Sequence, residues 1–128
     1  MTTDLARLAS GKYVLLTTYR KSGEPVPTPV WVARDDDELV VWTTTNSGKV
    51  KRIRRESAVD VAPCDLRGKP QGDAVSGHAR LLEADDTECV RRLIARKYGV
   101  LGWLTIFGSR LRRGNTGTIG IAITLTRP

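Results

Sequence analysis

Aromatic side chains are scarce in this 128-residue sequence, at 5% of the residues, and histidine occurs once. The aromatics do not interleave with the basic residues, as a platform for stacked nucleic-acid bases would require. No apolar run approaches the ~20 residues that a membrane helix needs, and the first ten residues lack the apolar core of a signal peptide. We therefore expect a cytoplasmic protein with no membrane span and no nucleic-acid partner.

Cysteine is also rare. Cys64 and Cys89 are too few for a disulfide framework or a cysteine-based metal site, and we interpret both as reduced thiols. The single histidine, His78, has no serine, cysteine or carboxylate partner at a recognisable spacing, which favours a solvent-facing strand residue. No metal site and no catalytic residue can be named from the sequence.

Basic residues, by contrast, are in surplus: 21 lysines and arginines face 14 acidic residues, a net charge of +7. Such a surplus attracts polyanions, among them nucleic acid, an anionic membrane surface or a phosphorylated small molecule. With 40% hydrophobic and 27% charged residues, the chain has the composition of one globular domain, 1–128.

Short segments of β-branched and apolar residues separated by turns dominate the pattern. They predict strands over 12–19, 26–33, 38–44, 58–64, 74–82 and 117–126. Helical periodicity predicts helices over 3–9, 47–56, 87–98 and 101–111. Together they indicate a mainly β (α+β) fold: a six- or seven-stranded, antiparallel, partly open split β-barrel with three or four short helices.

One stretch suggests an anion site. Thr43 and Thr44 end a predicted strand, and a helix capped by Asn46 or Ser47 follows with Lys49 in its first turn. Free backbone N–H groups at a helix start favour a phosphate, which would offset the unfavourable placement of lysine there. A merely solvated basic helix remains the alternative. The pattern is not a Walker loop, so nucleotide hydrolysis is not expected.

A second stretch combines prolines with a tryptophan. Prolines alternate over 25–29, and because proline cannot donate to a strand ladder, one side of this strand should be an edge or face a cleft. Trp31 offers a flat apolar wall for a planar ring. A proline-protected edge strand with Trp31 in the core explains the pattern equally well.

Three further features favour structural explanations. Basic neighbours could lower the pKa of Cys64, but a structural cysteine is favoured. The acidic segment 35–37 is typical of a hairpin turn rather than a metal site. The arginines within 110–113 either meet a second anionic group or form a solvated loop.

The order and spacing of these motifs resemble the pyridoxamine 5′-phosphate oxidase-like, flavin-binding split-barrel superfamily. The resemblance rests on the segments 28–31, 41–43 and 47–54. The segments 61–72 and 96–99 are similar to an actinobacterial branch described as coenzyme F420-dependent oxidoreductases.

This resemblance implies a homodimer with cofactor at the subunit interface and hydride transfer between the deazaflavin and a small conjugated organic substrate. FMN is the alternative cofactor, and a non-catalytic module that binds flavin, deazaflavin or haem is the alternative function. The cofactor-binding residues that we expect are Thr28, Pro29, Val30, Trp31, Thr43, Thr44, Ser47, Gly48, Lys49, Arg52, Pro63 and Cys64.

One departure from the superfamily pattern concerns Ser47, where many members carry an arginine. The phosphate clamp is then weaker unless Lys51, Arg54 or Arg55 compensates. The arginine-rich signatures of true pyridoxamine phosphate oxidases are missing as well, so a role in vitamin B6 synthesis is not expected.

Overall fold

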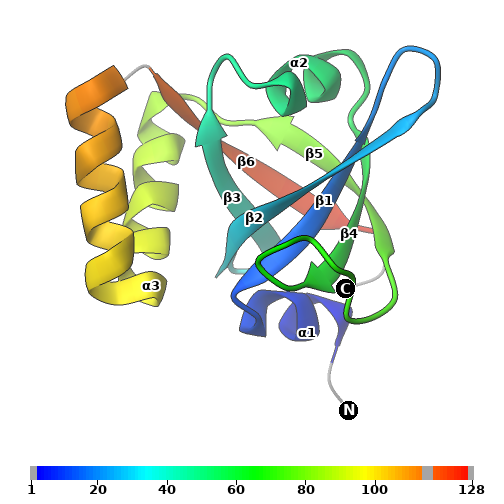
Figure 1. The fold of residues 1–128 in the computed structure, drawn as a ribbon, viewed down its shortest axis with the longest axis horizontal. Coiled ribbons are helices and arrows are strands. Elements are labelled where there is room, and N and C mark those ends of the chain that lie inside the picture. The colour runs from blue at the N-terminus through cyan, green and yellow to red at the C-terminus, as the bar shows by residue number, and fades with distance from the viewer. Residues whose placement is uncertain (1–2, 114–116, 127–128) are drawn as a thin grey trace.

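The computed structural model describes residues 3–113 and 117–126. For residues 100–113 it describes the backbone but not the side chains. Within the described ranges, six antiparallel strands close into a barrel in the order β1-β2-β3-β6-β5-β4 (Figure 1). The strands are β1 (Tyr13–Tyr19), β2 (Pro25–Asp35), β3 (Glu38–Thr44), β4 (Ala58–Cys64), β5 (Val75–Leu81) and β6 (Thr118–Leu125). The mainly β antiparallel barrel expected from the sequence is thereby confirmed.

Three helices surround this barrel within the described residues (Figure 1). Helix α1 (Asp4–Ser10) lies at one end of the barrel and α2 (Gly48–Arg55) at the other. Helix α3 (Ala84–Arg113) runs along the outside and doubles back at Gly99, where φ is 64° and ψ is −140°. Residues with a side chain rarely adopt this backbone conformation, so glycine is needed at the reversal. None of the helices described is both long and apolar enough to cross a bilayer.

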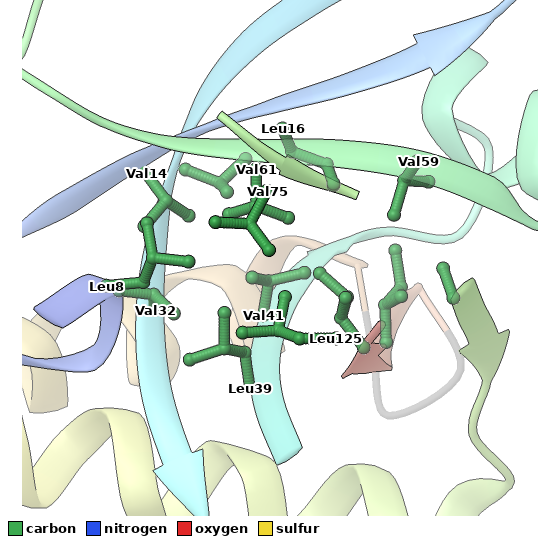
Figure 2. Packing of buried hydrophobic residues seen from close by; sticks show 14 of the residues in the cluster. Leu8, Val14, Leu16, Val32, Leu39, Val41, Val59, Val61, Val75 and Leu125 are labelled. Carbon is green, nitrogen blue, oxygen red and sulfur yellow. The ribbon is translucent and has the colours of Figure 1, made fainter. Parts of the chain in front are cut away.

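Alternating strand residues divide the apolar side chains between two layers. The inner layer fills the barrel, where Val14, Leu16, Val32, Leu39 and Val41 converge (Figure 2). The outer layer lies between α3 and the outer faces of β2, β3 and β6. The members of this layer are Trp31, Ala33, Val40, Trp42, Leu82, Val90, Leu93, Ile94, Ala95, Tyr98 and Ala122.

Two local details differ from the sequence expectation. The ring of strands closes because β1 pairs with β4 from Tyr13↔Cys64 to Thr17↔Asp60, whereas the local pattern suggested a partly open barrel. Pairing between strands so distant in the chain leaves no local signature. The N-cap of α1 is Thr3, whose hydroxyl accepts from the N–H of Ala6, rather than Asp4.

Candidate functional site

The barrel wall parts between β2 and β3. These strands pair only between Val32↔Val41 and Asp35↔Glu38, and the first half of β2 pairs with β1 alone among the described residues. Beyond Val41, β3 instead continues alongside β6. The first half of β2 and the last residues of β3 are therefore not paired with each other, and this split in the strand ladder lies at the end of β3 that precedes α2.

The proline-rich half of β2 forms one side of this split. Val32 donates its N–H to the hydroxyl of Tyr98, which in turn donates to the carbonyl of Lys12, on the β1 side of the strand. Successive strand residues direct their N–H groups to opposite sides. The prolines, one residue out of phase with Val32, therefore direct their nitrogens toward the unpaired side. This confirms the edge or cleft expected from their spacing.

The start of α2 lies at the end of β3. Ser47 is the N-cap, and its hydroxyl accepts from the N–H of Val50 at 3.4 Å. Its own N–H donates to the carbonyl of Thr44, which ties the cap to the strand end. The other N–H groups of a first helical turn have no partner within their helix and attract anions. Thr43, Thr44, Ser47 and Gly48 are thus brought together here, as expected.

Arg52 folds back over this helix start. Its Nε donates to Oγ1 of the fully buried Thr18 at 2.6 Å. A Cβ built on Gly48 would lie only 2.7 Å from Nη1 of Arg52, so the guanidinium lies against the first turn of α2. Burial, with the charges of Arg20 and Arg55, lowers the pKa of Arg52.

Lys49 is half-buried beside this guanidinium. Burial is the main cause that lowers its pKa, and the charge of Arg52 adds to it. Among the residues that the structure describes, no carboxylate oxygen lies within 4.0 Å of the side-chain nitrogens of Lys49 or Arg52. Two partly buried cations without an acidic partner favour a bound anion, since each gains an interaction that the protein does not supply.

The three basic residues that could compensate for Ser47 lie differently on α2. Arg55 donates from Nη2 to the carbonyl of Tyr19 at 2.5 Å, and so is engaged on the β1 side of α2. Lys51 and Arg54 are exposed. The basic side chain that folds back onto the helix start is that of Arg52, which Thr18 holds there.

An aromatic wall stands at the closed end of the split, where Trp31 and Trp42 adjoin the Val32↔Val41 pair. Trp31 stacks on Tyr98 of α3, with ring centroids 4.4 Å apart and the ring planes 9° apart. Trp42 lies in the same outer layer, and its Nε1 is buried without a hydrogen-bond partner in the described part of the chain. A buried N–H donor without an acceptor costs free energy that a bound acceptor would recover. Thr28, Pro29 and Val30 precede Trp31 on the strand.

Pro63 and Cys64 lie elsewhere. Cys64 pairs with Tyr13 at the start of β1, whereas Arg52 contacts Thr18 near its end. From Tyr13 to Thr18 the strand rises about 17 Å. Within one chain the structure therefore does not bring Pro63 and Cys64 to the helix start.

Cys64 and His78 lie as expected for residues without a catalytic role. Burial raises the pKa of Cys64, and Asp65 raises it further, which opposes a reactive thiolate. His78 is exposed on β5, where it contacts Ser57. The arginines of 110–113 lie outside the side chains that the structure describes.

Three residues of this region were missed in the sequence. Thr18, Lys97 and Tyr98 act through long-range contacts with α2, α1 and β2. For Thr18 a signal existed: alternation with the apolar Val14 and Leu16 places its hydroxyl on the inner face, where a buried polar group requires a partner.

The closed antiparallel barrel with its split between β2 and β3 is a split-barrel type of fold, and the comparison with known proteins agrees. The model of the pyridoxamine 5′-phosphate oxidase family matches residues 4–124. The chain therefore belongs to this family. No curated protein sequence matches it.

Solved structures share the fold at low sequence identity. A conserved hypothetical protein from Mycobacterium tuberculosis, Rv2991, is 20% identical with a TM-score of 0.70, covering 99% of this chain and 82% of that one. An F420 reductase is 19% identical with a TM-score of 0.65, covering 98% and 96%. The heme storage protein HutZ from Vibrio cholerae is 12% identical with a TM-score of 0.62, covering 91% and 83%.

Proposed function

We propose that this chain is an oxidoreductase that binds coenzyme F420 and transfers a hydride between the deazaflavin and a small conjugated organic substrate. The observation that carries the proposal is the start of α2, where Lys49 and Arg52 are partly buried without an acidic partner among the described residues. This arrangement fits a phosphate group, which the cofactor would provide.

The residues present divide into two parts of one binding surface. At the helix start, Lys49, Arg52 and the free N–H groups of α2 hold the phosphate, and the hydroxyls of Thr43 and Thr44 line the approach. Along the split, the segment 28–31 provides a flat wall, with the unpaired Nε1 of Trp42 nearby as a donor. From Trp42 to Thr44 the strand rises about 7 Å, so wall and phosphate site lie within the span of one extended cofactor.

When bound, the deazaflavin supplies the hydride chemistry. The protein orients the ring against Trp31, which is itself fixed by Tyr98. The segment 28–31 also excludes water from one side of the ring, and Lys49 and Arg52 neutralise the phosphate. None of these roles requires a catalytic acid or base, and we assign none.

FMN is the alternative cofactor for the same surface. Its ring and phosphate resemble those of F420, but the F420 tail carries additional carboxylates. The net charge of +7 favours the more anionic ligand.

The proposal includes a homodimer with the cofactor at its interface. The first half of β2, which includes the segment 28–31, has no strand partner on its β3 side. A second copy of the chain would cover this side. Pro63 and Cys64 belong to a cofactor site only if the second copy brings them there.

A non-catalytic haem-binding module is less well supported. Haem iron is commonly held by a histidine, a cysteine thiolate, a methionine or a tyrosinate. His78 lies on β5 away from the split, and burial keeps Cys64 as a thiol. The wall therefore has neither a histidine nor a thiolate nearby, and burial raises the pKa of its tyrosine, Tyr98, which opposes a tyrosinate ligand.

Titration of one preparation with F420 and with FMN tests the proposal. We expect F420 to bind more tightly, and Lys49→Ala to weaken its binding by about 1.5–3 kcal/mol, or roughly 10–150-fold, as for a hydrogen bond to a charged group. Lys51→Ala, an exposed lysine on the same helix, is the matched control and should change the affinity far less. Equal affinities for wild type and Lys49→Ala would contradict the site, and tighter FMN binding would reassign the cofactor.

A further inference from the structure

A pocket of about 240 Å³ lies on the far side of Trp31 from the phosphate site, where β1 begins and the first half of α3 ends. Its lining consists of Lys12, Tyr13, Trp31, Lys97 and Tyr98. Tyr13 and Trp31 are direct cross-strand partners, so their rings share one face of the sheet. Three of the seven aromatic residues of the chain thus gather around one small cavity.

Hydrogen bonds hold the pocket in shape without a ligand. The Nζ atom of Lys97 donates to the carbonyls of Ala9, Gly11 and Val32 at 2.6, 2.7 and 2.7 Å. These bonds use all three donors of the ammonium group. The neighbouring Tyr98 hydroxyl accepts from the N–H of Val32 at 3.1 Å. The walls are therefore positioned by α1, β2 and α3 together, and binding would require little reordering.

The pocket carries positive charge without acidic compensation. None of its lining residues is acidic, and Lys12 is exposed with no ion pair from its side chain among the described residues. Because Lys97 has already used its donors, Lys12 is the cation available to a ligand. The volume is below the roughly 300–1,000 Å³ typical of sites for drug-sized ligands, which limits an occupant to one or two rings.

We propose that this pocket binds a flat aromatic or conjugated molecule that carries a negative charge, with its ring against Tyr13 and Trp31 and its anionic group at Lys12. This inference rests on the proposed function for its role: because Tyr98 covers one face of Trp31, the pocket would hold the conjugated acceptor at the edge of the indole, where acceptor and cofactor can meet without a ring between them. The binding itself is independent of any cofactor.

The test compares two probes of the same shape, 2-naphthoate and the uncharged 2-naphthamide, by NMR titration of the indole N–H signals without cofactor. We expect naphthoate to shift the signal that is missing from the spectrum of Trp31→Phe. Lys12→Gln should weaken naphthoate up to about fivefold, the scale of an exposed ion pair, and leave naphthamide unchanged. Lys21→Gln, which removes the same charge at the far end of β1, is the control and should change neither probe.

Absence of any shift at Trp31, or equal effects of Lys12→Gln and Lys21→Gln on naphthoate, would overturn the proposal. F420 titrations of the same variants separate this failure from that of the cofactor site. Naphthoate binding to a protein that does not bind F420 would leave the pocket standing and remove the proposed function. F420 binding that depends on Lys49, together with no naphthoate binding, would do the reverse.

Discussion

The indole of Trp31 lies parallel to the phenol ring of Tyr98, 4.4 Å away between centroids, although one is in the second strand and the other in the last helix. The hydroxyl of the same tyrosine accepts from the N–H of Val32 and donates to the carbonyl of Lys12. One side chain thus fixes both the tryptophan wall and the backbone beside it.

Two substitutions separate these contributions. Tyr98→Phe keeps the stack but leaves the N–H of Val32 without its acceptor, and we expect the free energy of unfolding to fall by about 1–3 kcal/mol. Tyr98→Leu also removes the stacked ring, for a further loss of about 0.5–1.5 kcal/mol. Urea unfolding measures both. A Phe variant as stable as wild type would show that the hydroxyl bonds contribute nothing net.

Gly48 allows a test of the phosphate site that separates binding from stability. In Gly48→Ala the new methyl group would meet Nη1 of Arg52 at 2.7 Å, and the flexible guanidinium can move away from it. We expect the stability to stay constant or rise slightly, because alanine is the better helix former. The affinity for F420 should fall about tenfold with the displaced charge. A variant that binds F420 normally would place Arg52 outside the phosphate site.

The two cysteines should differ sharply in reactivity. Cys64 is 5% exposed, and burial raises its pKa, whereas Cys89 is exposed. Because the thiolate is the reacting form, iodoacetamide should alkylate Cys89 in the native protein and Cys64 only after unfolding. Mass spectrometry of peptides from the treated protein checks the order, and Cys89→Ser should leave the native protein nearly unreactive. Rapid native labelling of Cys64 would contradict its burial.

Much of this fold could be predicted locally. Strands 38–44 and 58–64 match the structure residue for residue, since their alternation and flanking turns leave little choice. Helix α3 begins at Ala84, three residues before the expected start at Thr87. Thr87 instead uses its hydroxyl to accept from the N–H of Gly120 at 3.0 Å, a contact with a distant strand that no local pattern reveals.

The site was predictable where it depends on one segment. A cap at Asn46 or Ser47 and the cations that follow could be predicted from the order of residues, and the structure has Ser47 as the cap. The tether from Arg52 to Thr18, and the three carbonyls that meet the ammonium of Lys97, could not. These contacts exist only because the closed barrel brings its ends and its outer helix together.

The charge of Lys49 should lower the free energy of unfolding as long as no ligand is bound. Burial and the charge of Arg52 lower its pKa below the ordinary value of 10.5. Between the two values the unfolded chain binds more protons than the folded one, so the free energy of unfolding rises with pH in that window. Below the folded value, at neutral pH, the cost is present in full.

Lys49→Met removes that charge and keeps most of the side-chain length. We expect it to raise the free energy of unfolding at pH 7, and the advantage over wild type to shrink as pH approaches 10.5. Taking the difference between the two proteins cancels the titration of their shared tyrosines. Lys51→Met, at an exposed position, should show neither the gain nor the trend. If Lys49→Met instead destabilises the protein at neutral pH, the ammonium is already satisfied within the folded chain, and no anion is needed to balance it.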